Sequence, residues 1–137
     1  MSTFSLEVLT PEKLFFAQEV EALTVTSVDG QMTVLKDHMV MTAPLDVGSI
    51  KIKQDGAWRE AFQSEGFLEV GEHGVTHVFV QACEWAEDID AARAAAAAHR
   101  MEERMRQQRS MMEYQWSKIA LARAMTRLRI TKNQNFD

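Results

Sequence analysis

The sequence lacks the features that mark secreted, membrane-spanning or disulfide-stabilised proteins. It has one cysteine, Cys83, which excludes an internal disulfide and agrees with a reducing compartment. No apolar run approaches the roughly 20 residues that a transmembrane helix needs. The first residues, Met1–Ser5, contain neither a basic nor an apolar region, so we expect no signal peptide. These absences favour a cytoplasmic protein.

Motifs typical of enzymes are also missing. The chain has no Gly-rich phosphate loop, no pair of carboxylates in a catalytic setting and no Ser-His-Asp pattern. Cys83 has no basic neighbour in the sequence that would activate its thiol. His73 and His77 lack a second pair of ligands for a metal ion. We therefore expect a non-catalytic protein with no metal site and no required cofactor.

What the sequence does contain is a strong asymmetry of charge along 137 residues, a length that fits one domain or one domain with an appendage. Residues 1–87 hold 14 acidic and five basic side chains, whereas residues 88–137 hold six acidic and ten basic ones. A nucleic-acid-binding protein usually carries its basic surface on the folded domain. An acidic body with a basic arm instead suits docking on an acidic protein surface or binding of a polyphosphate.

The first 85 residues have the pattern of an all-β domain, because short apolar segments recur at intervals of roughly 8–12 residues. We expect strands at Phe4–Leu9, Leu14–Phe16, Ala22–Thr26, Gln31–Leu35, Val47–Lys53, Trp58–Gln63, Phe67–Val70 and Val75–Cys83. Asp55-Gly56 predicts a type I′ hairpin turn, since this dipeptide tolerates positive φ angles. Alternation gives way to helical spacing at Trp85–Asp88.

From Asp88 to Ile130 the spacing predicts two helices joined by a turn at Gln107–Arg109. The first apolar seam comprises Ala91, Ala94, Ala98, Met101 and Met105. The second comprises Tyr114, Ser117, Leu121, Ala124 and Leu128. Ser110 and Glu113 have the capping-box spacing that would start the second helix at Met111. Small seam residues let antiparallel helices approach closely, so we expect a helical hairpin with a frayed end at Thr131–Asp137.

Four arginines fall on matching faces of the predicted hairpin. Arg93 and Arg100 are seven residues apart on the first helix, and Arg123 and Arg127 are four apart on the second. Folding the chain about residue 109 brings all four within a span of roughly 10 Å. Like charges this close repel unless they fan out into water or an anion lies between them. Both a solvated surface and an anion site therefore stay open.

Several short motifs follow one another in an informative order. They are Leu9-Thr10-Pro11, Asp29-Gly30-Gln31-Met32 leading to His38, Thr42-Ala43-Pro44-Leu45, Gly48–Ile52, Gly66–Val70, Ile89–Ala94 and Leu121–Leu128. Over nearly its whole length the chain resembles the epsilon subunit of bacterial F-type ATP synthases, which is called delta in mitochondria. Ile89–Ala94 fits the pattern I/L-D-x-x-R-A, which some bacterial members use to bind ATP.

The resemblance implies an α+β fold, in which an antiparallel β-sandwich (residues 1–87) precedes an antiparallel two-helix hairpin (residues 88–137). In this family the sandwich packs on the gamma subunit at the foot of the central stalk, touches the c-ring and rotates with both. The hairpin either lies compact, a form that ATP favours, or extends beside gamma toward the alpha and beta subunits and inhibits ATP hydrolysis. The complex would be held at the cytoplasmic face of a bacterial cell membrane and would translocate protons or sodium ions.

Candidate site residues follow from the same resemblance. An ATP site, with magnesium ATP as a regulatory ligand, would comprise Glu84, Asp90, Arg93, Arg100, Arg123 and Arg127. The arginines would donate charge-assisted hydrogen bonds to phosphates. Asp90 could equally be the N-cap of the first helix, with Asp88 as a rival for that position.

The c-ring contact would involve Gln31 and His38. The family loop usually carries a glycine and a proline where this chain has Thr33 and Lys36. A buried structural histidine is the alternative for His38.

Two functions of other classes remain open. One is a structural adaptor whose hairpin is fixed and binds no nucleotide, which an ATP titration would distinguish. The other is a nucleic-acid-binding module, for which binding should weaken steeply with salt. The acidic character of residues 1–87 argues against the second.

Overall fold

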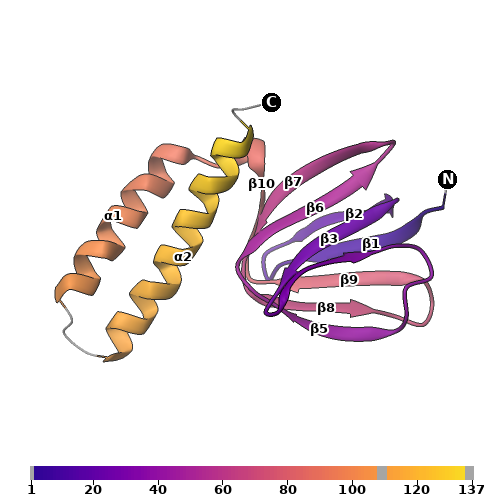
Figure 1. Cartoon of the computed structure of the whole chain (residues 1–137), viewed down its shortest axis with the longest axis horizontal. Coiled ribbons are helices and arrows are strands. Elements are labelled where there is room, and N and C mark those ends of the chain that lie inside the picture. The colour runs from indigo at the N-terminus through magenta and orange to yellow at the C-terminus, as the bar shows by residue number, and fades with distance from the viewer. Residues whose placement is uncertain (1, 108–110, 135–137) are drawn as a thin grey trace. The chain divides into compact units, whose positions relative to one another are not determined.

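The computed structural model describes residues 2–107 and 111–134 and divides the chain into two compact units, Met1–Trp85 and Ala86–Asp137. The first unit, called the strand unit below, consists of β-strands, and the second contains the helices (Figure 1). The expected α+β fold, with a β-sandwich followed by a two-helix hairpin, is confirmed.

Ten strands form one continuous sheet in the strand unit. They are β1 (Phe4–Leu9), β2 (Leu14–Val20), β3 (Ala22–Ser27), β4 (Gly30–Val34), β5 (Met41–Leu45), β6 (Gly48–Gln54), β7 (Ala57–Gln63), β8 (Gly66–Val70), β9 (Val75–Val80) and β10 (Cys83–Trp85). Their order is β10-β7-β6-β3-β5-β8-β9-β1-β2, with β4 paired to β3. The sheet folds over on itself (Figure 1), and β3 meets β5 through one residue pair, Ser27 with Leu45. All pairs are antiparallel except β1 with β9, which run parallel.

Alternating apolar side chains fill the space between the two layers. In β6, Ile50 and Ile52 are buried as the alternation predicts. In β1, Leu6 and Val8 are fully buried in the same core. The sheet is thus a sandwich with an apolar interior, and residues at the intervening positions lie on its outer faces.

One strand was missed by the sequence analysis. β5 contains Pro44, and a proline argues against a strand because it has no backbone N–H to donate. The carbonyl oxygen of Pro44 accepts a hydrogen bond from the backbone N–H of Val28. In an extended strand the nitrogen of a residue points to the same side as its carbonyl. The nitrogen of Pro44 therefore faces β3, where pairing is limited to one residue pair, and little is lost.

The expected single strand Val75–Cys83 is two strands. β9 pairs with β8 and β1, whereas β10 pairs with β7 in the other half of the sheet. Between them the backbone N–H of Ala82 donates to the hydroxyl of Ser64, at 2.8 Å, and the carbonyl of Ala82 accepts from the N–H of Ser64, at 3.0 Å. These bonds hold the chain where it leaves one layer for the other.

The predicted type I′ turn is confirmed. Asp55 and Gly56 have φ angles of 49° and 77°, both positive, as this turn requires. The backbone N–H of Gly56 donates to a carboxylate oxygen of Glu21 at 3.0 Å, which ties the turn to the end of β2.

The helical unit begins with a short 3₁₀ helix, η1 (Ala86–Asp88), followed by α1 (Ala91–Gln107) and α2 (Met111–Gln134). The two α-helices lie side by side and run antiparallel (Figure 1). Four small residues are buried on the predicted seams: Ala94, Ala98, Ser117 and Ala124. Neither described helix is long and apolar enough to cross a membrane.

The end of α2 differs from the prediction. Helix α2 continues to Gln134, so the expectation of fraying from Thr131 is wrong for residues 131–134. The hydroxyl of Thr131 donates to the carbonyl of Arg127, four residues earlier, at 2.9 Å, as Thr side chains within helices often do. The predicted turn beyond Gln107 and the cap at Ser110 lie outside the described residues.

Candidate partner and phosphate-binding sites

Asp90 caps the first helix. Its carboxylate oxygen accepts a hydrogen bond from the backbone N–H of Arg93 at 3.0 Å, and its carbonyl accepts from the N–H of Ala94 at 3.0 Å. This is the geometry of an N-cap residue, which satisfies backbone donors that the first helical turn leaves free. The rival cap, Asp88, is instead the last residue of η1. A capping carboxylate at a helix N-terminus also stays partly open to solvent, as the exposure of Asp90 shows.

The helices carry four of the expected site residues, which we call the arginine cluster: Arg93, Arg100, Arg123 and Arg127. Met101 of α1 and Ser117 of α2 line one cavity and so lie at about the same level of the hairpin. Counted from that level, Arg93 lies level with residue 125, two residues from both Arg123 and Arg127. Arg100 lies about five residues, or roughly 8 Å, along the axis from Arg123. The cluster therefore occupies roughly 14 Å along the hairpin.

The arginine cluster lies on one side of the hairpin. At about 100° per residue, Arg93 and Arg100 are about 120–140° around α1 from its buried alanines. Arg123 and Arg127 are about 70–110° around α2 from its buried seam, and in an antiparallel pair this rotation leads to the same side. The two α1 arginines are exposed and the two α2 arginines are half-buried. Guanidiniums arranged in this way suit an anion with several oxygens.

Glu84 is not part of the hairpin. It lies half-buried in β10, opposite Phe62 of β7, and belongs to the strand unit. Its charge acts on its neighbour Cys83. Burial, and to a smaller extent the Glu84 carboxylate, raise the pKa of the Cys83 thiol to about 12, although Lys13 opposes the shift. Cys83 is therefore a neutral, buried thiol, in agreement with the inert role expected of it.

The expected c-ring residues lie on β4 and the loop after it. Gln31 is exposed in β4, opposite Thr26 of β3. His38 is half-buried rather than buried, and its Nδ1 lies 2.9 Å from the carbonyl oxygen of Met39. The turn before it is closed by a hydrogen bond from the N–H of His38 to the carbonyl of Leu35.

This loop also exposes apolar side chains. Met39 is 74% exposed, and Leu35 and Val40 are more than half exposed. We call these three residues the apolar loop. Exposed apolar side chains that cluster on a short loop are typical of a contact with another protein.

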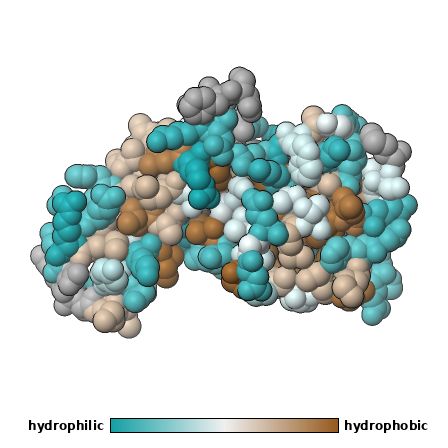
Figure 2. Space-filling view, in the orientation of Figure 1, coloured by the Kyte–Doolittle hydropathy of each residue, from teal (hydrophilic) through white to brown (hydrophobic). Residues whose placement is uncertain are grey.

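A second apolar surface crosses the outer face of the sheet, and the sequence analysis missed it. Strand register places five apolar residues side by side in what we call the apolar row: Pro44, Phe67, Phe79, Leu9 and Leu14. The rings of Phe67 and Phe79 stack with their centroids 4.8 Å apart. Phe67 and Leu14 are 43% and 54% exposed, so the row is open to a partner. Figure 2 shows that hydrophobic residues interrupt the hydrophilic surface of the chain on the face in view.

Next to the apolar row runs a polar one, called the acidic row, with Thr42, Glu69, His77, Glu7 and Ala17 in register. His77 Nε2 lies 3.2 Å from a carboxylate oxygen of Glu7, and its Nδ1 lies 3.9 Å from one of Glu69. The imidazole also stacks on Phe79, with the ring centroids 5.6 Å apart. Among the described residues, no group of three His, Cys, Asp or Glu side chains is placed to hold a metal ion.

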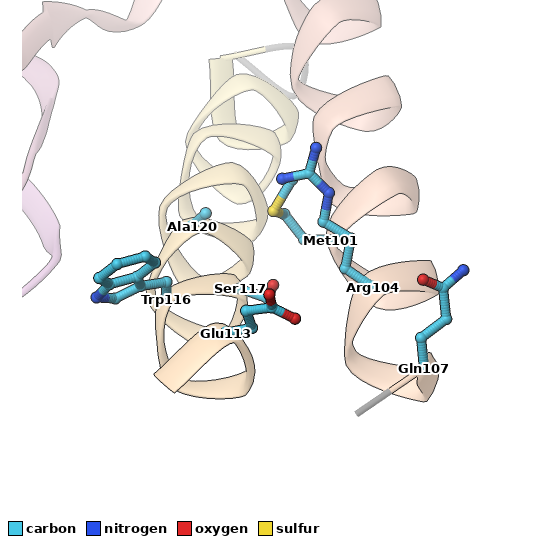
Figure 3. Close-up of a pocket in the computed structure, with 7 residues that line it drawn as sticks. All are labelled: Met101, Arg104, Gln107, Glu113, Trp116, Ser117 and Ala120. Atoms are coloured by element: carbon cyan, nitrogen blue, oxygen red, sulfur yellow. The ribbon is translucent and has the colours of Figure 1, made fainter. Parts of the chain in front are cut away.

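The hairpin has a cavity between its helices, toward the end where α1 gives way to α2 (Figure 3). Its lining comprises Met101, Arg104, Gln107, Glu113, Trp116, Ser117 and Ala120. Met101 and Ser117 project into the space between the helices, whereas the indole of Trp116 points away from it (Figure 3). The lining holds both a guanidinium and a carboxylate, so it has no single-sign field for an anion.

Comparison with known proteins decides the family. The sequence model of the ATP synthase delta/epsilon chain β-sandwich domain matches residues 3–86, and that of the delta/epsilon chain long α-helix domain matches residues 87–132. The chain belongs to the ATP synthase delta/epsilon family. Like other members of this family, it is a non-catalytic subunit and a component of the central stalk.

Relatives agree with the epsilon type that the motifs suggested, and a solved structure shares the fold. The ATP synthase epsilon chain of Caldanaerobacter subterraneus subsp. tengcongensis is 50% identical over 129 residues, which is 93% of each chain. That of Ruminiclostridium cellulolyticum is 42% identical over 134 residues, 98% of this chain and 99% of the relative. A chain of the Euglena gracilis mitochondrial ATP synthase has the same fold, with a TM-score of 0.80 at 19% identity, covering all of this chain and 83% of the other.

Proposed function

We propose that this epsilon-type chain joins the gamma subunit to the c-ring of a proton- or sodium-translocating ATP synthase, and that its hairpin restrains ATP hydrolysis. The single observation that carries the proposal is the pair of exposed apolar surfaces on the strand unit. The apolar row offers one flat contact, and the apolar loop offers a second, smaller one. A subunit that links two partners needs two such surfaces.

The larger surface suits gamma and the smaller one suits the c-ring. A row of five apolar residues across five strands can bury a long segment of a neighbouring subunit. The apolar loop, with Gln31 and His38 nearby in sequence, is a compact projection that fits the polar loops at the end of a c-ring. A chain bound in this way would sit peripherally at the cytoplasmic face of the bacterial membrane, held there by its partners.

The hairpin suits a mobile regulatory role because it has little holding it together. The buried residues of α1 are alanines, so closure of the hairpin removes little apolar surface from water. Two arrangements of the helices can then lie close in free energy. In the extended one, the basic arm would reach acidic surface on the alpha and beta subunits and slow hydrolysis.

ATP, bound with magnesium, is the proposed ligand of the arginine cluster and favours the compact hairpin. The four guanidiniums would contact phosphate oxygens, with Asp90 holding the first turn of α1 in place. Glu84, which the family resemblance also assigns to the ATP site, belongs to the strand unit.

The experiment that tests this function is binding of the full-length chain to purified gamma. Phe67→Glu places a charge within the apolar row and should weaken gamma binding at least tenfold, equivalent to about 1.4 kcal/mol or more. Phe67→Leu, which keeps the row apolar, should retain most of the affinity. If Phe67→Glu folds and binds gamma as tightly as the parent chain, the apolar row is not the gamma contact.

A further inference from the structure

We infer that docking on the apolar row is coupled to proton uptake by the acidic row, in which the imidazole of His77 becomes a cation that bridges Glu7 and Glu69. The inference rests on the proposed function, in which the partner that covers this face is gamma. It adds a chemical requirement to that contact, namely that the covered surface be neutral or basic.

The geometry of the imidazole carries the inference. His77 stands in the middle of the acidic row, and each of its ring nitrogens points to a different carboxylate. The Nδ1 atom is buried and makes no hydrogen bond, although Glu69 lies 3.9 Å away. A neutral imidazole has one N–H and turns a lone pair toward the second carboxylate. An imidazolium ion can donate toward both carboxylates at once, which a neutral imidazole cannot do.

The charges around His77 come from the neighbouring strands. Glu69 of β8 and Glu7 of β1 flank it in register, while Thr42 of β5 and Ala17 of β2 end the row without charge. The next carboxylate is that of Glu19 in β2, which accepts a hydrogen bond from the hydroxyl of Ser5 at 3.1 Å. The row itself contains no lysine or arginine. Its net charge is therefore −2 with neutral His77 and −1 with protonated His77.

The net charge of the acidic row becomes important when a partner covers this face of the sheet. While the face is open to water, solvent screens the two carboxylates. When a partner covers the adjacent Phe67 and Phe79, the carboxylates lose water, and a buried charge without a counter-charge is costly. Protonated His77 supplies that counter-charge from within the row. The bound state thus holds more protons than the free state, and binding should strengthen as the pH falls through the range in which histidine gains charge.

The negative charge of the acidic row also limits which side chains gamma can place against it. Gamma should present an apolar strip to the stacked phenylalanines and a neutral or basic side chain to Glu7 and Glu69. An acidic side chain at that place would add to the uncompensated charge and oppose docking.

The test measures the dissociation constant of full-length chain and purified gamma between pH 6 and pH 8. Because one proton is linked, the affinity should fall by several-fold over this range, and by at most about tenfold per pH unit. Calorimetry in two buffers of different ionisation enthalpy should show uptake of up to one proton per complex near neutral pH.

His77→Gln is the decisive variant, because glutamine keeps a hydrogen-bonding side chain but cannot carry charge. It should bind gamma with an affinity that depends little on pH. His73→Gln, at the exposed histidine in the β8–β9 turn, is the matched control and should keep the pH dependence of the parent. Glu69→Gln leaves His77 with one carboxylate and should reduce the slope without removing it.

The outcomes are separable. If gamma binds and the His77→Gln variant, shown to be folded by its circular dichroism, keeps the parent's pH dependence, the inference is wrong and the gamma contact stands. If the parent chain shows no binding at any pH, the proposed function itself fails. A calorimetric proton uptake that disappears in His77→Gln supports the inference.

Discussion

At the scale of single residues, the side-chain amide of Gln63 joins separate parts of the sheet through hydrogen bonds to their backbone groups. It is fully buried at the end of β7. Its amide nitrogen donates to the carbonyl oxygens of Asp46 and Thr26 at 2.7 and 2.9 Å, and its oxygen accepts from the N–H of Thr26 at 3.4 Å. One amide therefore links β7 to β3 and to the β5–β6 connection, at the place where the sheet turns between its layers.

Replacement of this amide should be costly. Gln63→Leu is similar in size but removes all three hydrogen bonds of the amide, while the Thr26 carbonyl keeps a bond from the N–H of Asp46. We therefore expect a loss of about 1–3 kcal/mol in the free energy of unfolding. Urea denaturation followed by tryptophan fluorescence would measure the loss. Gln81→Leu, at an exposed position, is the control and should change stability by less than about 0.5 kcal/mol. Equal effects of the two substitutions would show that the network around Gln63 contributes little.

The raised pKa of Cys83 predicts that the stability of the folded chain depends on pH in the alkaline range. Its thiol pKa is raised from 9.0 to about 12 by burial, so between these values the unfolded chain loses its proton while the folded chain keeps it. Stability should therefore be unaffected below pH 9 and fall above it by up to about 1.4 kcal/mol per pH unit from this group. Cys83→Ala should lose less stability between pH 9 and pH 10.5 than the parent chain. Identical slopes for the two proteins would contradict the raised pKa.

At the scale of elements, helix α1 combines strong helix propensity with weak packing. Residues 94–98 are all alanine, the best helix former, and the buried residues of the helix are two of them, Ala94 and Ala98. The element can thus remain helical while its contact with α2 is loose. This combination suits the proposed regulatory role, in which the two helices separate and come together again.

Substitutions of Asp90 can distinguish its role as the N-cap of α1 from a role in binding ATP. Asp90→Ala removes the hydrogen bond to the N–H of Arg93 and should destabilise the helical unit by about 0.5–2 kcal/mol. Asp90→Asn caps almost as well, so it should keep the helix content measured by circular dichroism. If Asp90→Asn nevertheless binds ATP more weakly than the parent chain, the carboxylate also serves the ligand. Loss of helix in both variants would mean that its charge, and not its hydrogen bond, holds the turn.

The arginine cluster predicts a ligand-dependent stability. A ligand that binds only the compact hairpin stabilises it by about 2.7 kcal/mol at a hundredfold excess over Kd. Magnesium ATP at millimolar concentration should therefore raise the thermal midpoint, and Arg93→Ala and Arg127→Ala should each reduce the shift. Arg129→Ala is the matched control, because Arg129 follows Arg127 by two residues but lies on the opposite side of the hairpin. An absent shift in the parent chain would leave the cluster as a solvated surface.

At the scale of the whole molecule, the chain divides into two compact units. The proposed function gives assembly to the strand unit and regulation to the helical unit. The strand unit has its own core, so a chain without residues 88–137 should still bind gamma. In the assembled ATP synthase the same deletion should raise the rate of ATP hydrolysis, because it removes the arm that is proposed to inhibit hydrolysis. Hydrolysis assays on complexes with the full and the shortened chain would measure this. A shortened chain that folds but no longer binds gamma would reverse the assignment.

Local sequence determined the parts of this protein that depend on neighbouring residues. Alternation located most strands, Asp55-Gly56 fixed a hairpin turn, and the 3, 4, 3, 4 spacing identified the buried alanines of the hairpin. The order of short motifs over the whole chain was sufficient to identify the family. Each of these features is encoded within a few residues, since turns and helical faces are local structures.

Tertiary structure alone decided which distant residues meet. Pro44 became acceptable in a strand because its nitrogen faces a place with limited pairing, and Val75–Cys83 was divided because the chain changes layers there. The apolar and acidic rows draw one residue from each of five strands, and the parallel pairing of β1 with β9 brings Glu7 to His77 across 70 positions of sequence. Periodicity reports which face of a strand a residue occupies, but register between strands is set by the packing of the whole sheet.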